Sequence, residues 1–249
     1  MMSCLNSVYN ITKQSKIFIL SPHIDDACFS LGGILSNLKC RKTIWNVFSY
    51  TYYSKYGKNK DVMLQRKTED KCFCETIDAK TIYTEYADAE ARGYNCLSDY
   101  FGVPTQVAIT ENWDLIKEIS QQIISRLGKD NVDIVFVPMA AGNHIDHLIV
   151  RQSAILAMCT LKKNSTIVFY EDLPYAVDTN KMELAKKEIQ YYFKLKEQHA
   201  EISYKNKTKL IEIYRSQIFS RDIDLIIKYS KSIERGKSCE RMWMLQEYN

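Results

Sequence analysis

The sequence has no apolar run that approaches the roughly 20 residues needed to cross a membrane. Its first residues, MMSCLNSVYNITKQSK, lack the charged start and continuous apolar stretch of a signal peptide. Lysine and arginine total 34 against 30 acidic residues, and no block of five or six like charges suggests a nucleic-acid arm. We therefore expect a soluble, cytoplasmic protein with no membrane span and no nucleic-acid partner.

Paired cysteine motifs are also absent, because none of the eight cysteines belongs to a CxxC pair. The closest pair, Cys72 and Cys74, has no second pair or histidine nearby in the sequence to complete a four-ligand zinc site. Most of the cysteines lie within apolar patterns. We expect reduced, buried thiols rather than disulfides or a structural metal site.

Glycine and proline are scarce, at 8 and 4 residues, which is typical of a chain built from regular elements. Short apolar runs alternate with amphipathic stretches, the pattern of a mostly parallel sheet flanked by helices. This pattern predicts a Rossmann-like α/β fold. The expected strands are 17–20, 43–51, 81–83, 133–137 and 167–170. The expected helices are about 27–39, 61–77, 112–127 and 146–160.

After Pro174 the pattern changes to lysine-rich amphipathic stretches. We expect helices there at 181–197, 206–218 and 221–235, with a short strand near 199–204. No linker, internal repeat or low-complexity segment separates this part from the rest. We therefore predict a single domain over residues 1–249, and the sequence leaves both a monomer and a homo-oligomer open.

Histidine is scarce as well, and three of the four histidines lie in two short motifs. SPHIDD, with His23, follows the first predicted strand, and GNHIDH, with His144 and His147, follows the strand DIVFV. In open parallel sheets, ligands bind beyond the carboxyl ends of the strands, where the loops converge. We predict that the two motifs meet at one rim of the sheet.

Imidazole and carboxylate groups suit zinc, and hydrolytic zinc sites commonly use three protein ligands. Residues three apart on a helical turn share a face, so His144 and His147 can point to one place, as can His23 and Asp26. The adjacent Asp25 and Asp26 diverge, so one carboxylate can bind the metal while its neighbour stays free for proton transfer. These spacings predict a Zn²⁺ site.

Each of these residues also has a purely structural use. Asp25 or Asp26 could cap the following helix, His144 and Asp146 could form a second capping pair, and His147 could pack on the sheet. Two carboxylates and three imidazoles at two strand ends favour a metal site over these separate uses.

The two motifs resemble the His-x-Asp-Asp and His-x-Asp-His stretches of the PIG-L or LmbE-like zinc-dependent N-deacetylases. The resemblance covers most of the chain and implies an LmbE-like three-layer sandwich. RKTED, VFYEDLPYA and IYRSQ are shorter and less specific matches. The chain departs from the family at Ile24, at Ala27 and in the stretch SYTYYSKYGKNK, and the last departure leaves the substrate open.

The resemblance implies that zinc is bound by His23, Asp26 and His147. It further implies that Asp25 is the general base and that His144, protonated and held by Asp146, assists the developing oxyanion. The reaction would be hydrolysis of an acetamide.

The substrate side of the prediction is less specific. Arg66, Glu171 and Asp172 could hydrogen-bond sugar hydroxyls or an amine, or form surface ion pairs. Several tyrosines flank the expected rim and suit either sugar rings or core packing: Tyr50, Tyr52, Tyr53, Tyr170 and Tyr175. We expect removal of an N-acetyl group from an acetylated amino sugar or glycoconjugate. Hydrolysis of another small amide and a sugar-binding module without activity are the alternatives.

Overall fold

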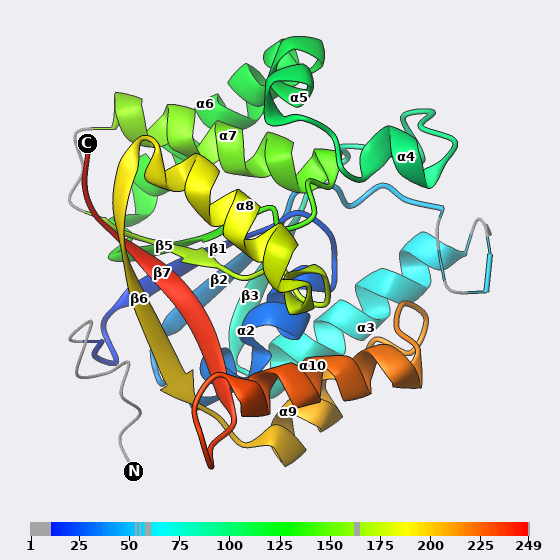
Figure 1. Ribbon diagram of the computed structural model, residues 1–249, viewed down its shortest axis with the longest axis vertical. Coiled ribbons are helices and arrows are strands. Elements are labelled where there is room, and N and C mark those ends of the chain that lie inside the picture. Colours follow the sequence, from blue (N-terminus) through cyan, green and yellow to red (C-terminus); the bar gives the residue numbers. More distant parts are fainter. Residues whose placement is uncertain (1–10, 53, 55, 58–60, 162–164, 249) are drawn as a thin grey trace.

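One seven-stranded sheet runs through the molecule in the order β3-β2-β1-β4-β5-β7-β6 (Figure 1). The computed structural model describes residues 11–52, 54, 56–57, 61–161 and 165–248. Five strands are parallel: β1 (Lys16–Ser21), β2 (Arg41–Asn46), β3 (Ala79–Tyr83), β4 (Ile134–Pro138) and β5 (Thr166–Tyr170). All five residues of β4 are buried, as expected for a strand covered on both faces.

Helices cover both faces of this sheet (Figure 1). One layer contains α5 (Thr105–Glu111), α6 (Trp113–Asp130), α7 (Ile145–Thr160) and α8 (Thr179–Gln190). The other contains α2 (Asp26–Asn37), α3 (Val62–Thr76), α9 (Tyr204–Ile211) and α10 (Ser220–Ser232). The short helices α4 (Leu97–Tyr100) and η1 (Tyr175–Val177) lie in loops. This three-layer α/β arrangement confirms the predicted fold class.

The C-terminal third adds two antiparallel strands to the same sheet, β6 (Phe193–Glu201) and β7 (Cys239–Tyr248). The predicted helix 181–197 is therefore wrong in its second half, since α8 ends at Gln190. Strand β6 lies at the sheet edge, where charged side chains are common and make a strand resemble an amphipathic helix in sequence. The predicted strand near 199–204 captures only the end of β6, and β7 was not predicted. A single domain over residues 1–249 stays a prediction, which the shared sheet supports.

Smaller differences have local causes. Strand β2 ends at Asn46 rather than Thr51, because its partner β1 ends at Ser21 and the chain then turns along Pro22. Helix α9 ends at Ile211, well before the expected residue 218. Helices α4 and α5 were not predicted. Among the described cysteines, all free, Cys72, Cys96 and Cys159 are exposed rather than buried, and Cys4 lies outside the described residues.

The strand order places a natural binding crevice between β1 and β4. From β1 the chain proceeds to β2 and β3 on one side, while β4 leads to β5 on the other. Loops that leave neighbouring strands in opposite directions open a crevice at their carboxyl ends. Both histidine motifs lie at this point. Within the described ranges, no helix combines the length and apolarity needed to cross a membrane.

Candidate active site

A cavity of about 320 Å³ opens at the carboxyl ends of β1 and β4. Both histidine motifs contribute to its wall, through His23, Asp25, Asp26, His144 and Asp146. The rest of the wall comes from α2 and from segments farther along the chain. It includes Phe29, Arg66, Asp88, Glu90, Tyr100, Phe101, Tyr175 and Gln217. The fold thus gathers residues from most of the chain around one small chamber.

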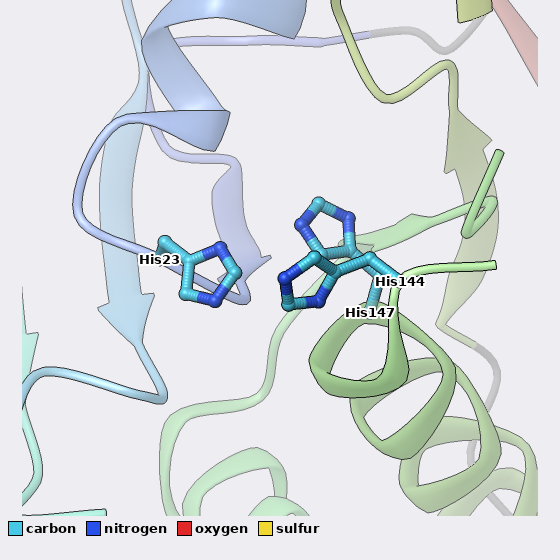
Figure 2. Close-up of side chains that lie close together, drawn as sticks. All are labelled: His23, His144 and His147. Atoms are coloured by element: carbon cyan, nitrogen blue, oxygen red, sulfur yellow. The ribbon is translucent and has the colours of Figure 1, made fainter. Parts of the chain in front are cut away.

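Three imidazoles lie close together at this end of the sheet, as Figure 2 shows. His23 lies in the loop between β1 and α2, His144 is the N-cap of α7, and His147 is in its first turn. The ring centroids are 4.9 to 5.2 Å apart, and one nitrogen from each ring lies within 4.8 Å of the others. Sequence positions more than 120 apart are therefore brought to one point.

Asp26 completes a tighter set of donors than the three rings alone. Its Oδ2 atom lies 3.4 Å from His23 Nδ1 and 3.3 Å from His147 Nε2. Ligand atoms on a tetrahedral zinc, with bonds of about 2.0–2.1 Å, are roughly 3.3–3.4 Å apart. His147 Nε2 is also buried without a hydrogen-bond partner among the described residues, which is unusual for a ring nitrogen. The spacing and the unmatched nitrogen both fit a zinc ion.

The far nitrogen of each of these two rings meets a buried carboxylate. His147 Nδ1 donates to Asp172 Oδ1 at 2.6 Å, and His23 Nε2 donates to Asp146 Oδ2 at 2.8 Å. Such partners fix the tautomer and orientation of a metal-ligating histidine. In the neutral form of each ring, the lone pair then lies on the nitrogen that faces Asp26.

The two acidic residues expected to bind substrate lie elsewhere. Asp172 is fully buried behind His147 and also accepts a hydrogen bond from the Ala141 amide. Glu171 is buried as well and accepts hydrogen bonds from Tyr229, Arg241 and Trp243. Neither lines the cavity in the described part of the chain. Both carboxylates therefore accept hydrogen bonds from other groups of the protein.

Asp25 and Arg66 do face the cavity and form a pair. Arg66 Nη2 donates to Asp25 Oδ2 at 3.3 Å. Burial raises the pKa of Asp25, and the neighbouring Arg66 lowers it only in part. A carboxylate with a raised pKa is a better proton acceptor, as a general base requires.

His144 differs from the expectation in one respect. Its Nδ1 accepts a hydrogen bond of 3.1 Å from the Asp146 backbone amide, so Nε2 carries the proton of the neutral ring. Burial lowers the pKa of His144 well below its ordinary value, which favours a neutral donor over the expected imidazolium. The Asp146 carboxylate goes to His23 instead, so Asp146 holds His144 through its main chain.

The metal-free site is charged. Burial lowers the pKa of His23, but hydrogen bonds to Asp146 and Asp26 outweigh this and raise it to about 9. The carboxylates of Asp26 and Asp172 likewise raise the pKa of His147 above its ordinary value against the effect of burial. Burial and these two histidines act in opposite directions on the pKa of Asp26, which is held well below its ordinary value. A metal must displace the ring protons to bind.

Sequence reasoning missed the loop between β3 and α5. Arg92 from this loop pairs with Asp146 at 2.7 Å, and Phe101 packs edge-on against His144 at 4.8 Å between ring centroids. The loop carries no periodic pattern, so only its aromatic and charged residues could have marked it.

The tyrosines expected at the rim divide between two uses. Tyr175 lines the cavity. Tyr170 is buried and donates to the Leu20 carbonyl, whereas Tyr50 and Tyr52 are exposed and contact each other. Tyr53 lies outside the described residues. Of the described four, Tyr175 alone therefore lines the cavity beside the histidines.

Comparison with known proteins identifies relatives of this chain. Residues 18–158 match the sequence model of the family described as PIG-L, GlcNAc-PI de-N-acetylase. A 2'-N-acetylparomamine deacetylase of Streptomyces fradiae is 26% identical over 173 residues. That alignment covers 66% of this chain and 59% of the Streptomyces protein.

Solved structures share the fold. A deacetylase of teicoplanin biosynthesis aligns with a TM-score of 0.77 and 20% identity over 94% of this chain and 99% of that one. The zinc-inhibited form of teicoplanin deacetylase gives 0.75 and 21% with the same coverage. N,N'-diacetylchitobiose deacetylase from Pyrococcus horikoshii gives 0.57 and 16%, over 96% and 89% of the two chains. Since the family model spans more than half of the sequence, including both histidine motifs, the chain belongs to the PIG-L family.

Proposed function

We propose that this protein is a zinc-dependent hydrolase that removes the N-acetyl group from an acetylated amino sugar or glycoconjugate. One observation carries the proposal. Asp26 Oδ2 lies at zinc-ligand spacing from His23 Nδ1 and His147 Nε2, in the wall of a cavity that the carboxylate of Asp25 also lines. The fold alone would not suffice, because one fold hosts many reactions.

His23, Asp26 and His147 would hold the ion. When bound, zinc supplies a Lewis acid for the acetamide carbonyl and lowers the pKa of a water molecule toward about 7. The carboxylates of Asp146 and Asp172 keep the two imidazoles in the orientation that binding requires.

The remaining steps belong to residues of the chain. Asp25 accepts a proton from the attacking water and returns it to the nitrogen as the C–N bond breaks, which yields acetate and a primary amine. His144 donates its Nε2 proton in a hydrogen bond to the oxygen that becomes negative. Arg66 stays beside Asp25 throughout, and its position in the wall lets it reach a substrate hydroxyl as well.

The cavity suits one sugar unit of a larger substrate. Its volume is near the lower end of the roughly 300–1,000 Å³ typical of ligand pockets. Aromatic side chains of Phe29, Phe101 and Tyr175 offer flat apolar faces, and Asp88 and Gln217 offer polar groups. This mixture matches the apolar faces and hydroxyl edges of a pyranose ring.

Release of primary amine tests the proposal directly. The purified protein, loaded with zinc, is incubated with a panel of N-acetyl amino sugars and glycosides, and amines are detected with fluorescamine. We expect amine release that stops on addition of a chelator and returns with zinc, and that is absent in the Asp25→Asn variant. Zinc binding without amine release from any member of the panel would contradict hydrolysis of amino sugars.

A further inference from the structure

A turn at residues 88–92 lies directly behind the metal site on the side of His23. The Ala89 amide donates to Asp146 Oδ2 at 2.9 Å. Arg92 Nη2 lies 2.7 Å from Asp146 Oδ1, an ion pair with a carboxylate that has no exposed surface. Backbone and side chain of one short turn therefore grip both oxygens of the same buried carboxylate.

This grip determines where Asp146 points. Its Oδ1 faces Arg92, and its Oδ2 receives both the Ala89 amide and His23 Nε2. If the carboxylate rotated, it would lose contacts on both sides at once, in a place where water cannot replace them. The turn at residues 88–92 therefore fixes the position of the Asp146 oxygen that accepts the hydrogen bond from His23.

Arg92 is itself held in place. Its Nη1 donates to the Ala87 carbonyl at 2.8 Å, and its guanidinium carbon lies 4.9 Å from the Phe48 ring and 5.5 Å from the Tyr94 ring. The side chain is 17% exposed. A planar guanidinium can stack on rings and bind a carbonyl and a carboxylate together, whereas the compact ammonium of lysine cannot do all three.

We propose that Arg92 is a positioning residue for the metal centre. It holds Asp146 so that Oδ2 accepts the Nε2 proton of His23, and this leaves the Nδ1 lone pair directed toward the place that His23 shares with Asp26 and His147. The inference rests on the proposed function, since it requires that His23 be a zinc ligand. It adds a residue that touches neither metal nor substrate but acts on affinity for the metal through two others.

A purely structural role of Arg92 would have a different consequence. If Arg92 only ties the turn to the body of the protein, its loss lowers thermal stability and leaves the zinc affinity of the folded protein unchanged. If it positions Asp146, zinc affinity falls beyond any change in stability. Changes in the groups behind metal-ligating histidines typically weaken binding about 10–100-fold.

The experiment compares Arg92→Met and Arg92→Lys with Arg126→Met. Arg126 is a matched control, because it is also half-buried and stacks on a ring, that of Trp45 at 4.7 Å, but its Nη2 donates to Gln122 rather than to a carboxylate behind the metal site. For each folded, metal-free protein we would measure the melting temperature and then the zinc dissociation constant by competition with a chromophoric chelator. Amine release at limiting and saturating zinc completes the set.

We expect Arg92→Met to bind zinc about 10–100-fold more weakly, with Arg92→Lys between it and the unchanged protein, and Arg126→Met equal to the unchanged protein. Turnover of Arg92→Met should recover at saturating zinc. Zinc affinity of folded Arg92→Met within threefold of the unchanged protein would overturn the inference and leave the proposed function intact. Should Arg92→Met fail to fold, Arg92→Lys decides by the same criterion. If the unchanged protein binds no zinc, the proposed function and this inference are both wrong.

Discussion

Two clusters of buried charge lie at opposite ends of helix α2. The site cluster, at its start, consists of His23, Asp26 and His147 with the carboxylates behind them. The anchor cluster lies near its end, where Glu240 of β7 accepts hydrogen bonds from the Gly33 and Ile34 amides at 2.9 and 2.7 Å. Lys207 of α9 pairs with the same carboxylate, and neither side chain of that pair is exposed.

The clusters differ in how completely they are satisfied. In the anchor cluster each oxygen of Glu240 accepts a hydrogen bond, and opposite charges meet directly. In the site cluster His147 Nε2 is left without a hydrogen-bond partner within the described ranges, and acceptors converge on one point. Burial of charge is therefore common to a structural and a functional cluster. The convergence of ligand atoms on one point, with His147 Nε2 left without a hydrogen bond, distinguishes the site cluster.

The largest expected effect concerns the different roles of Asp25 and His147 at the site cluster. Asp25→Asn should lower kcat about 10²–10⁴-fold, because the general base is lost, while bound zinc stays at the level of the unchanged protein. His147→Ala should instead lower zinc content. Kinetics together with elemental analysis measures both quantities. Loss of zinc in folded Asp25→Asn would contradict the division of roles.

The anchor cluster should respond in stability alone. Lys207→Met leaves the Glu240 carboxylate buried without its cation, which typically costs about 3–5 kcal/mol. We expect a large drop in melting temperature and an unchanged zinc dissociation constant for the folded fraction. Lys205→Met, at an exposed position of the same helix, is the control and should change neither. A weakened zinc affinity in Lys207→Met would break the separation between the clusters.

The pH dependence of zinc binding tests the charge of the site cluster. Because the pKa of His23 in the metal-free protein is raised to about 9, zinc must displace a proton below that pH. Displacement of the His23 proton should make affinity rise about tenfold per pH unit, and this contribution should level off above about pH 9.

The stability of the metal-free protein should change in the opposite direction. The contribution of His23 is fully present below its unfolded pKa of 6.5 and is lost as the pH rises through about 9. Competition titrations and melting curves at several pH values measure both trends. An affinity for zinc that does not vary between pH 6.5 and 9 would contradict the assignment of His23 as a ligand.

The smallest expected effect concerns the close approach near the anchor cluster. A Cβ atom added to Gly33 would lie 2.8 Å from Ile202 Cγ2, whereas one added to the adjacent Gly32 would meet nothing closer than 3.5 Å. Gly33→Ala should therefore lose about 1–3 kcal/mol through overpacking. Gly32→Ala should be neutral or slightly stabilising, because alanine favours a helix by about 1 kcal/mol. Denaturant unfolding of the two variants checks the difference, and equal stabilities would refute the packing explanation.

The sequence predicts the site better than its surroundings, for a physical reason. His23 and His147 follow strands whose apolar runs are unmistakable, and parallel topology brings strand ends to one edge. Strand β6 was partly assigned to a helix because its identity depends on pairing with β7, which lies about 45 residues away in sequence. The partners of Asp172 and Arg92 depend likewise on distant packing. Local spacing contains no trace of such contacts.

The turn at residues 88–92 has a consequence for how substrate preference can evolve. Asp88, Ala89 and Glu90 line the cavity, while the Ala89 amide and the Arg92 side chain of the same turn hold Asp146. Loops that shape a pocket usually diversify freely, and insertions in them are tolerated. Here a single inserted or deleted residue would move the Ala89 amide and the Arg92 side chain away from their places beside Asp146. A change in the length of this turn would therefore disturb the support of the metal site together with the shape of the cavity, whereas a point change at Glu90 alters the cavity wall alone.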